Sequence, residues 1–375
     1  MTNKFSIFNF QFSIFKRLFD SNALWLSMLI GAVGYKLFLP LKPLLPWLIF
    51  FMLFFTFCKV NPLDLRLHKW HWMVLAIQIL FSLATYYGIM ALTGNPVLAQ
   101  GLLLCFIMPT ATAAPIIAGK LGGSIQNLTS FTLLSNFATS IIVPTLFPLV
   151  TNNQSLLAID QLSITFWPAF ALIISRVAPL LLIPFFSAWL LRLGVNYYYR
   201  RKSLTAKRSY SEAVLQQSGP TAEGGQKGFE LSPRLAQIPF YLWVASIVVL
   251  SAAVTETTLT NYQSQITNII ILIIGSFIAC LLQFGLGKLI GYYFPAPSKG
   301  KDYQDVLINP AAAPTTMAGV SSITAGQAFG QKNTSLGVWM AQTYLDPLSS
   351  LGAAAYIIWQ NIFNSLQLTL AARKK

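Results

Sequence analysis

Long, almost uncharged apolar runs follow one another along this chain, and they constrain its fold more than any other feature. The segments 71–93, 124–150 and 264–294 are examples. A run of about 18 or more apolar residues can cross a bilayer as a helix. Because lipid cannot hydrogen-bond peptide groups, each run must satisfy its own backbone as an α-helix. With 55% apolar and 9% charged residues, the chain is predicted to be an all-α polytopic membrane protein, with the lipid bilayer as its first partner.

Ten transmembrane helices are predicted, with the ranges 22–40, 43–60, 71–93, 96–119, 124–150, 164–193, 235–256, 264–294, 316–345 and 347–371. The longest polar stretch, 194–234, has a basic start followed by Gly, Ser and Gln, which is typical of a flexible cytoplasmic linker. A site for a regulatory partner is the alternative. The linker separates an N-terminal five-helix repeat in 1–193 from a C-terminal repeat in 235–375. The span 164–193 precedes the linker but belongs topologically to the second repeat.

Basic residues lie almost entirely on one side of this topology. With a cytoplasmic N-terminus, the cytoplasmic segments hold all of the 25 Lys and Arg residues except Lys36, Lys42, Arg176 and Lys332. Such an excess marks the cytoplasmic side, so both termini are predicted to be cytoplasmic. Topology therefore explains the net charge of +15, and a nucleic-acid partner is not indicated. Compact loops and the lack of a eukaryotic sorting signal favour a bacterial inner membrane.

Two of the spans are interrupted by residues that do not suit a membrane helix. The fourth span contains 108–115, where Pro109 and Pro115 remove backbone donors. The ninth contains the polar cluster 330–335, preceded by a further glycine at Gly326. Five spans in each half give the halves opposite orientations, and the fourth span of each is the broken one. This correspondence predicts an inverted repeat whose broken helices 4 and 9 cross near the bilayer midplane.

Charged side chains at membrane depth are rare, and they mark candidate functional positions. Lys332 lies in the ninth-span break, where a charge is costly unless it lines a cavity or meets a partner. The alternative is a structural lysine that pins the crossing. Arg176 lies mid-span in 164–193, where it either attracts an anionic substrate or faces an aqueous crevice without a ligand. None of the ten acidic residues lies clearly mid-span, which favours an organic anion over a cation as substrate.

Three motifs lie in the predicted ninth, tenth and fourth spans: Gly330-Gln331-Lys332-Asn333, Trp359-Gln360-Asn361 and Pro109-x-x-Thr112-Ala113. Together they resemble the motifs of the bile acid:sodium symporter family, and the resemblance follows span order over nearly the whole chain. It implies a panel domain and a core domain, the core formed by spans 3–5 and 8–10. It also implies secondary transport of organic anions, such as bile acids, sulfonated steroids or small carboxylates like pantothenate.

The resemblance also implies site residues. Thr112, Asn333 and Asn361 match positions that line the family's substrate crevice, and Lys332 would add positive charge there. The residues at 114–115 replace a Ser-Asn pair that binds sodium in the family.

The ninth-span sodium ligands of the family, a Glu and a Gln, correspond to Ala328 and Lys332. Gln78 and Thr132 match retained ligand positions, but two such groups make a poor site for a hard cation, which prefers several oxygen ligands. An ammonium at Lys332 would therefore stand where sodium stands in the family. The expected ion or coupling site comprises Lys332, Gln78, Thr132 and Gln331, with no metal.

The function expected from the sequence is secondary transport of a small organic anion by alternating access. Transport would be sodium-independent or proton-linked, without a cofactor. Two alternatives share the scaffold: a sodium-coupled symporter with a rebuilt ion site, and a cation/proton antiporter, which needs a titrating carboxylate at the breaks. A non-transporting receptor for the same ligand is a third. No His-Glu-x-x-His or Gly-x-Ser-x-Gly motif is present, so an enzyme is not indicated.

Overall fold

Helices make up nearly all of the regular structure in the computed structural model, which describes residues 23–60, 65–151, 165–214, 232, 235–296 and 316–373. Five helical segments are long and apolar enough to cross a membrane: Tyr35–Phe57, Lys69–Thr93, Ile125–Val150, Phe166–Tyr198 and Ile238–Tyr293. Two shorter apolar helices are Ala23–Val33 and Pro96–Ile107. The protein is therefore an all-α integral membrane protein, as its apolar runs predict.

After the helix Ala23–Val33, the order of elements is α2 (Tyr35–Phe38), η1 (Leu39–Leu44), α3 (Leu45–Phe57), α4 (Lys69–Thr93), α5 (Pro96–Ile107), α6 (Ala114–Lys120), α7 (Ile125–Val150), α9 (Phe166–Val214), η3 (Leu235–Gln237), α10 (Ile238–Tyr293), α12 (Met317–Gly330), α13 (Thr334–Tyr344), η4 (Pro347–Ser349) and α14 (Ser350–Arg373).

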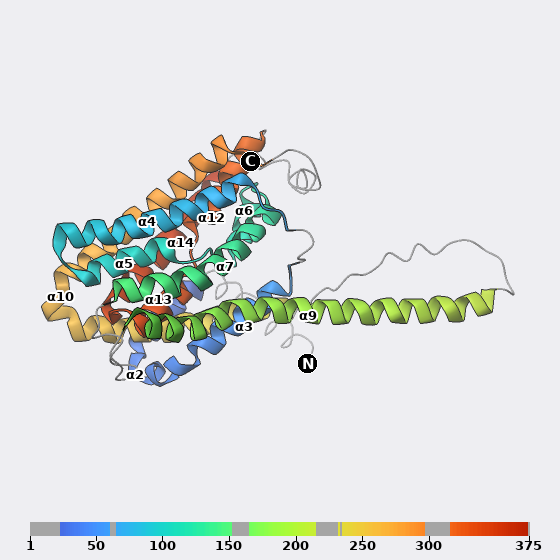
Figure 1. Cartoon of the computed structure of the whole chain (residues 1–375), viewed down its shortest axis with the longest axis horizontal. Helices are drawn as coiled ribbons and strands as arrows, with labels where there is room; N and C mark the ends of the chain where they lie inside the picture. Colours follow the sequence, from blue (N-terminus) through green and yellow to red (C-terminus); the bar gives the residue numbers. More distant parts are fainter. Residues whose placement is uncertain are drawn as a thin grey trace, which may run out of the picture.

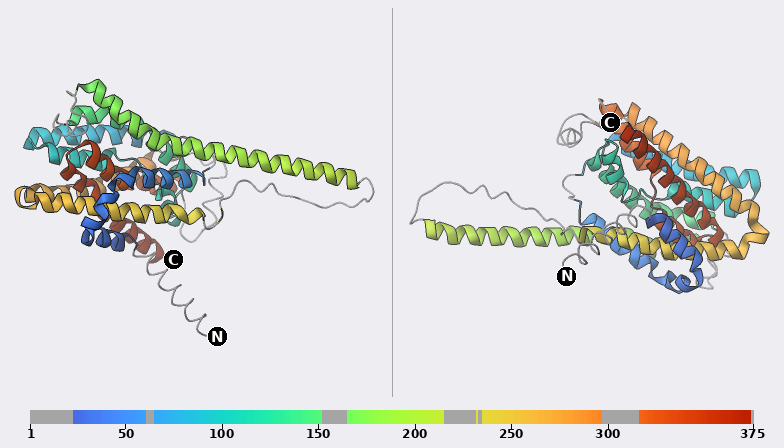
Figure 2. Two further views of the ribbon diagram at one scale, coloured as in Figure 1. Left: turned by 90° about the horizontal axis from the view of Figure 1, so that it is seen from below. Right: turned by 180° about the vertical axis from the view of Figure 1, so that it is seen from behind.

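The helices form two groups that face each other (Figure 1). In one group α3 packs against α9 and α10, and α2 lies beside α10. In the other, α5 packs against α4 and α14, and α12 packs against α6 and α7. The long helix α10 contributes to both groups, since it also packs against α12 and α14. Figure 2 shows α9 continuing well beyond both groups in each view.

The helix α10 consists of two helices joined at a kink. Gln265 has non-helical angles, with φ at −131° and ψ at 20°, in the middle of Ile238–Tyr293. Before the kink, α10 passes so close to the first helix that a Cβ on Gly31 would contact the carbonyl oxygen of Val248. After the kink, it packs on α12 instead. The kink therefore lets one continuous segment serve both groups.

Two glycines one turn apart allow the second part of α10 to pack closely against α12. A Cβ added to Gly287 would lie 2.5 Å from the carbonyl oxygen of Ala325, and one added to Gly291 would contact that of Ser321. Small residues at this spacing allow the backbones of two membrane helices to approach closely. This contact fixes α12, and with it the position of the break that follows Gly330.

Three sequence-based boundaries are wrong. Residues 194–214 belong to α9 instead of a flexible linker, because 195–214 contain no Gly or Pro and include helix-forming Ala, Leu, Lys and Arg. The linker residues 215–231 and 233–234 lie outside the described residues. Residues 257–263 are helical instead of forming a loop between two predicted spans. The predicted first span is interrupted by a turn at Gly34.

The helix α5 is surrounded by protein, with every residue from Val97 to Ile107 buried. Its last turn therefore ends inside the bundle, where water does not reach the free carbonyl groups that every helix leaves at its C-terminus. The three cysteines, Cys58, Cys105 and Cys280, are likewise buried and carry no disulfide.

Candidate functional site

The two helix breaks meet as a short antiparallel pair. Thr110, between α5 and α6, forms an isolated β-bridge with Lys332, between α12 and α13. Two backbone hydrogen bonds flank the bridge: Ala111 N donates to Gln331 O at 3.0 Å, and Asn333 N donates to Pro109 O at 2.7 Å. The hydroxyl of Thr110 adds a bond to Ala328 O at 2.7 Å. Non-helical backbone at membrane depth needs such internal partners, and each break supplies them to the other.

Side chains from three elements satisfy the carbonyl end of α5. Gln78 Nε2 of α4 donates to Ile107 O at 3.0 Å and to Met108 O at 3.1 Å. Gln283 Nε2 of α10 donates to Cys105 O at 3.0 Å. The remaining carbonyl, that of Phe106, accepts from Lys332 Nζ at 3.0 Å. The partial negative charge of this helix C-terminus is thus contacted by the amino group of Lys332 and by two side-chain amides.

Lys332 is almost completely enclosed, with 1% of its surface exposed. Besides the bond to Phe106, its ammonium lies 4.9 Å from the ring centre of Phe329, within the range of a cation–π contact. Its peptide group is held by Gln360 of α14, which accepts from Lys332 N at 2.8 Å and donates to Lys332 O at 3.3 Å. The side chain therefore points behind the crossing, toward the carbonyl end of α5.

Asn333 is the other well-defined side chain of this break. Its Oδ1 accepts from Leu336 N at 3.3 Å and caps α13, as Asn does at many helix starts. The residue is 5% exposed, and its Nδ2 has no hydrogen-bond partner within the described part of the chain. A buried amide donor without a partner costs free energy, so this atom is a candidate contact for a ligand.

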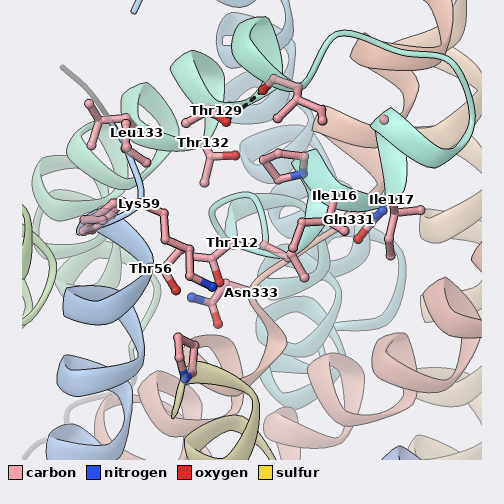
Figure 3. A pocket seen from close by; sticks show the side chains of 18 of the residues that line it. Thr56, Lys59, Thr112, Ile116, Ile117, Thr129, Thr132, Leu133, Gln331 and Asn333 are labelled. Atoms are coloured by element: carbon pink, nitrogen blue, oxygen red, sulfur yellow. Dashed lines mark hydrogen bonds between the residues drawn. The ribbon is translucent and has the colours of Figure 1, made fainter. Parts of the chain in front are cut away.

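A cavity of about 1320 Å³ lies against the crossing. Its wall is formed by the C-terminal end of α3, most of α6, the first turns of α7 and α10, the two breaks and the middle of α14. It is a larger space than the roughly 300–1,000 Å³ of most small-molecule sites. Figure 3 shows side chains of the breaks and of α3 and α7 around it.

Most of the sequence-predicted residues line this cavity, and two do not. Those on its wall are Thr112, Thr132, Gln331, Lys332, Asn333 and Asn361. Gln78 lies behind the crossing on the carbonyl end of α5, and Arg176 is an exposed residue of α9 away from the wall.

The cavity is also lined by residues that were not predicted from the sequence to belong to the site. Lys59 and Arg66, counted there only as cytoplasmic loop charges, both line the wall. Thr56, one turn before Lys59 on α3, lines it as well. On α14, Asn364 is buried, and its Oδ1 has no hydrogen-bond partner among the residues that the structure describes; Asn364 follows Gln360 by one turn. The spacing of Thr56 and Lys59, three residues apart at a helix end, is the one sequence signal that could have placed them on a common face.

The charged residues that the structure describes on the cavity wall have one sign. They are Lys59, Arg66 and Lys332, and no Asp or Glu is among the described residues that line it. Lys59 is exposed by surface area, yet it has enough protein around it that desolvation lowers the pKa of its ammonium. A wall of cations, hydroxyls and amides favours an anionic ligand.

The sequence matches no protein-family model, and no curated protein matches it. The class of protein that fold and site define together is an integral membrane protein with two paired helix breaks beside a large cationic cavity.

Proposed function

We propose that the protein is a secondary transporter that moves a small organic anion by alternating access. The observation that carries the proposal is the bridge between Thr110 and Lys332 at the wall of a cavity whose described lining has cations but no acid. Broken membrane helices with their ends at a central site are a recurrent arrangement for substrate binding in transporters. In this proposal the fold is ten helices in two inverted five-helix repeats, forming a panel and a core.

Within that scheme, α3, α9 and the first part of α10 belong to the panel, and the breaks with α4, α5, α7, α12 and α14 belong to the core. The cavity reaches the end of α3 and the starts of α7 and α10, which are the cytoplasmic ends in the predicted orientation. The proposed conformation is therefore inward-facing, in a bacterial inner membrane with both termini cytoplasmic.

The opposite side carries hydrogen bonds that would hold panel and core together. Gln342 of α13 accepts from Lys42 Nζ at 3.0 Å and donates to Thr257 Oγ1 of α10 at 3.1 Å. It also donates to Ser350 Oγ of α14 at 2.9 Å. These bonds, which we call the Gln342 cluster, would have to separate when the cavity opens on that side.

In the proposed mechanism, Lys332 replaces the coupling cation. Its ammonium already occupies the carbonyl end of α5 through Phe106, so substrate binding needs no sodium. Lysine is well suited to this place because, unlike arginine, it can lose its proton when desolvated, which leaves proton coupling open. Substrate would contact Thr112, Asn333 and Asn361, with no part for an enzyme step or a cofactor.

A sodium-coupled symporter is the second candidate, and buried amide oxygens favour it. Gln78 Oε1, Asn136 Oδ1 and Gln283 Oε1 are buried without a hydrogen-bond partner in the described part of the chain. Oxygens of this kind are ligands for hard cations. A rebuilt ion site from such groups would give sodium-dependent binding in spite of Lys332.

Ligand-induced thermal stabilisation of the purified protein separates the two candidates, since a ligand that binds the folded state raises the melting temperature. Organic anions would be tested in sodium and in potassium, on the wild type and on Lys332→Gln. Equal stabilisation of the wild type in both salts, lost in Lys332→Gln, supports the lysine-for-sodium mechanism. Stabilisation in sodium alone supports the second candidate. Uptake of the stabilising anion into proteoliposomes then tests transport itself, and its absence would leave a binding protein.

A further inference from the structure

Lys332 leaves one requirement of the proposed function unmet. An anion that binds in the cavity needs a positive group facing it, but the ammonium of Lys332 donates to Phe106 O and lies over the Phe329 ring. With 1% of its surface exposed, this lysine neutralises the crossing without presenting its charge to the cavity. Another cation of the wall must therefore meet the ligand.

We propose that Lys59 binds the anionic group of the substrate, a carboxylate or sulfonate, together with Asn333 and Thr112. This inference rests on the proposed function and adds a binding residue to it. Lys59 follows the end of α3, so it approaches the cavity from the group of helices opposite the breaks. In Figure 3, Lys59 and Thr56 extend from α3 toward the side that carries Thr112 and Asn333.

The donors available at this place fit an anion. Asn333 offers the buried Nδ2 that has no partner among the described residues, and Thr112 offers a hydroxyl on the same wall. Thr56 already donates its hydroxyl to Met52 O at 2.7 Å, so its oxygen can accept but is not a spare donor. A carboxylate can accept from an ammonium and an amide at once, and bonds with ionised partners are the stronger kind.

Arg66 is the other cation of the wall that is exposed, and it is placed less favourably. It precedes α4, and its backbone N donates to Ser130 Oγ of α7 at 3.0 Å. A charge that does not contact the ligand mainly speeds its approach, whereas a charge that contacts the ligand sets its affinity. Arg66 is therefore expected to attract anions and Lys59 to hold them.

The placement of Lys59 has a mechanical consequence. Because Lys59 belongs to the α3 side and Asn333 to the break, one anionic group held by both links the two groups of helices. Binding would then favour conformations in which α3 and the breaks are close together.

The test compares acids with neutral analogues of similar shape. Pantothenate is compared with panthenol, and cholate with methyl cholate. The two acids are supplied as potassium salts, and cholate and its ester are kept below the micellar concentration. Binding to the full-length wild type, Lys59→Gln, Lys59→Arg and Lys69→Gln would be measured by thermal stabilisation and titration. Lys69, an exposed lysine at the start of α4, provides a control with the same change of charge.

For the wild type we expect an acid to bind at least tenfold more tightly than its neutral analogue. Lys59→Gln should weaken the acid about tenfold to a hundredfold and leave the analogue unchanged. Lys59→Arg should retain part of the preference, and Lys69→Gln all of it. If the acid binds the wild type and Lys59→Gln equally, this inference is wrong while the proposed function stands. If the wild type prefers no acid over its neutral analogue, both this inference and the proposed function are wrong. Equal melting temperatures of the wild type and Lys59→Gln without ligand would show that the variant is folded. If Lys59→Gln is not folded, Lys59→Arg is used for the same test.

Discussion

The ammonium of Lys332 lies 3.0 Å from the carbonyl oxygen of Phe106, and this bond joins the break after α12 to the last turn of α5. On the same segment as Lys332, Asn333 N donates to Pro109 O of the other break. One break thus holds the other through both its backbone and its side chain. The crossing therefore holds an ionisable side chain whether or not any ion is bound.

Replacing Lys332 by Met should stabilise the protein while abolishing function. An ammonium has three donors, and the described residues give it one hydrogen bond and one aromatic ring. Replacing a poorly compensated buried charge by an apolar side chain of similar length should raise the free energy of unfolding by about 1–3 kcal/mol, which outweighs the lost bond to Phe106. Thermal melting in detergent and substrate uptake would be measured together. A clearly lower melting temperature for Lys332→Met would identify the lysine as a structural pin.

Loss of the Gln342 cluster should shift the protein away from the observed conformation. Gln342→Ala removes the bonds to Lys42 and Thr257. Each is worth about 1 kcal/mol, so the ratio of the two conformations should change roughly thirtyfold. A cysteine introduced at Asn361 would be labelled from the cavity side, against a background in which Cys58, Cys105 and Cys280 are buried.

Labelling of that cysteine should slow severalfold in the Gln342→Ala background. Thr343→Ala, next to Gln342 on α13 but bonded only within its own helix through Trp339 O, serves as the control. Unchanged labelling in Gln342→Ala would show that the cluster does not hold the two sides together.

A side chain at Gly291 should separate α10 from α12. In Gly291→Val the new atoms would meet the carbonyl oxygen of Ser321, a backbone atom that cannot turn aside. Forced overpacking of this kind costs about 1–3 kcal/mol or more, and it would also displace the break at the end of α12. Gly285→Val is the control, because nothing lies within 4 Å of a Cβ there. The melting temperature should fall sharply for the first variant and stay near the wild-type value for the second; similar values for both would contradict the packing argument.

Anion binding should weaken at alkaline pH, and should begin to do so below the ordinary titration range of lysine. Desolvation lowers the pKa of Lys59, so its ammonium loses the proton earlier as pH rises. Among the described residues, Arg66 also lies on the cavity wall, and Arg192 of α9 donates to Val60 O, next to Lys59 in the chain, at 3.1 Å.

A bound anion opposes this loss by stabilising the charged form, so the pKa of Lys59 should rise on binding. Titrations of pantothenate binding across neutral to alkaline pH would show the decline for the wild type. Lys59→Gln, whose residual binding lacks the titrating group, should give a flat profile, and a parallel decline in both proteins would rule Lys59 out.

Local chemistry explains which parts of this structure the sequence could predict. The break at 108–113 follows from Pro109, and the break at 331–333 from a polar cluster that no lipid-facing helix could hold. Both are properties of short segments. The pairing of Thr110 with Lys332 joins positions more than two hundred residues apart, and its register depends on how α10 seats α12 through Gly287 and Gly291.

The missed residues have a similar explanation. Lys59 reads as one more cytoplasmic lysine, since nothing nearby in sequence shows that the breaks lie across from the end of α3. Conversely, Arg176 is conspicuous in sequence because it lies mid-span, yet it is exposed on α9 and away from the cavity wall. Hydropathy locates a charge by depth in the membrane but does not give its direction around a helix.

The extension of α9 offers a practical route to experimental structure. Small membrane proteins give cryo-electron microscopy little to align, because most of their mass lies inside the detergent micelle. Residues 194–214 continue the transmembrane helix for about 30 Å at 1.5 Å per residue. A helical fusion partner spliced in register into this segment would inherit the orientation of the bundle and serve as a rigid fiducial. The same fiducial would report the tilt of α9 in each conformation of the proposed transport cycle.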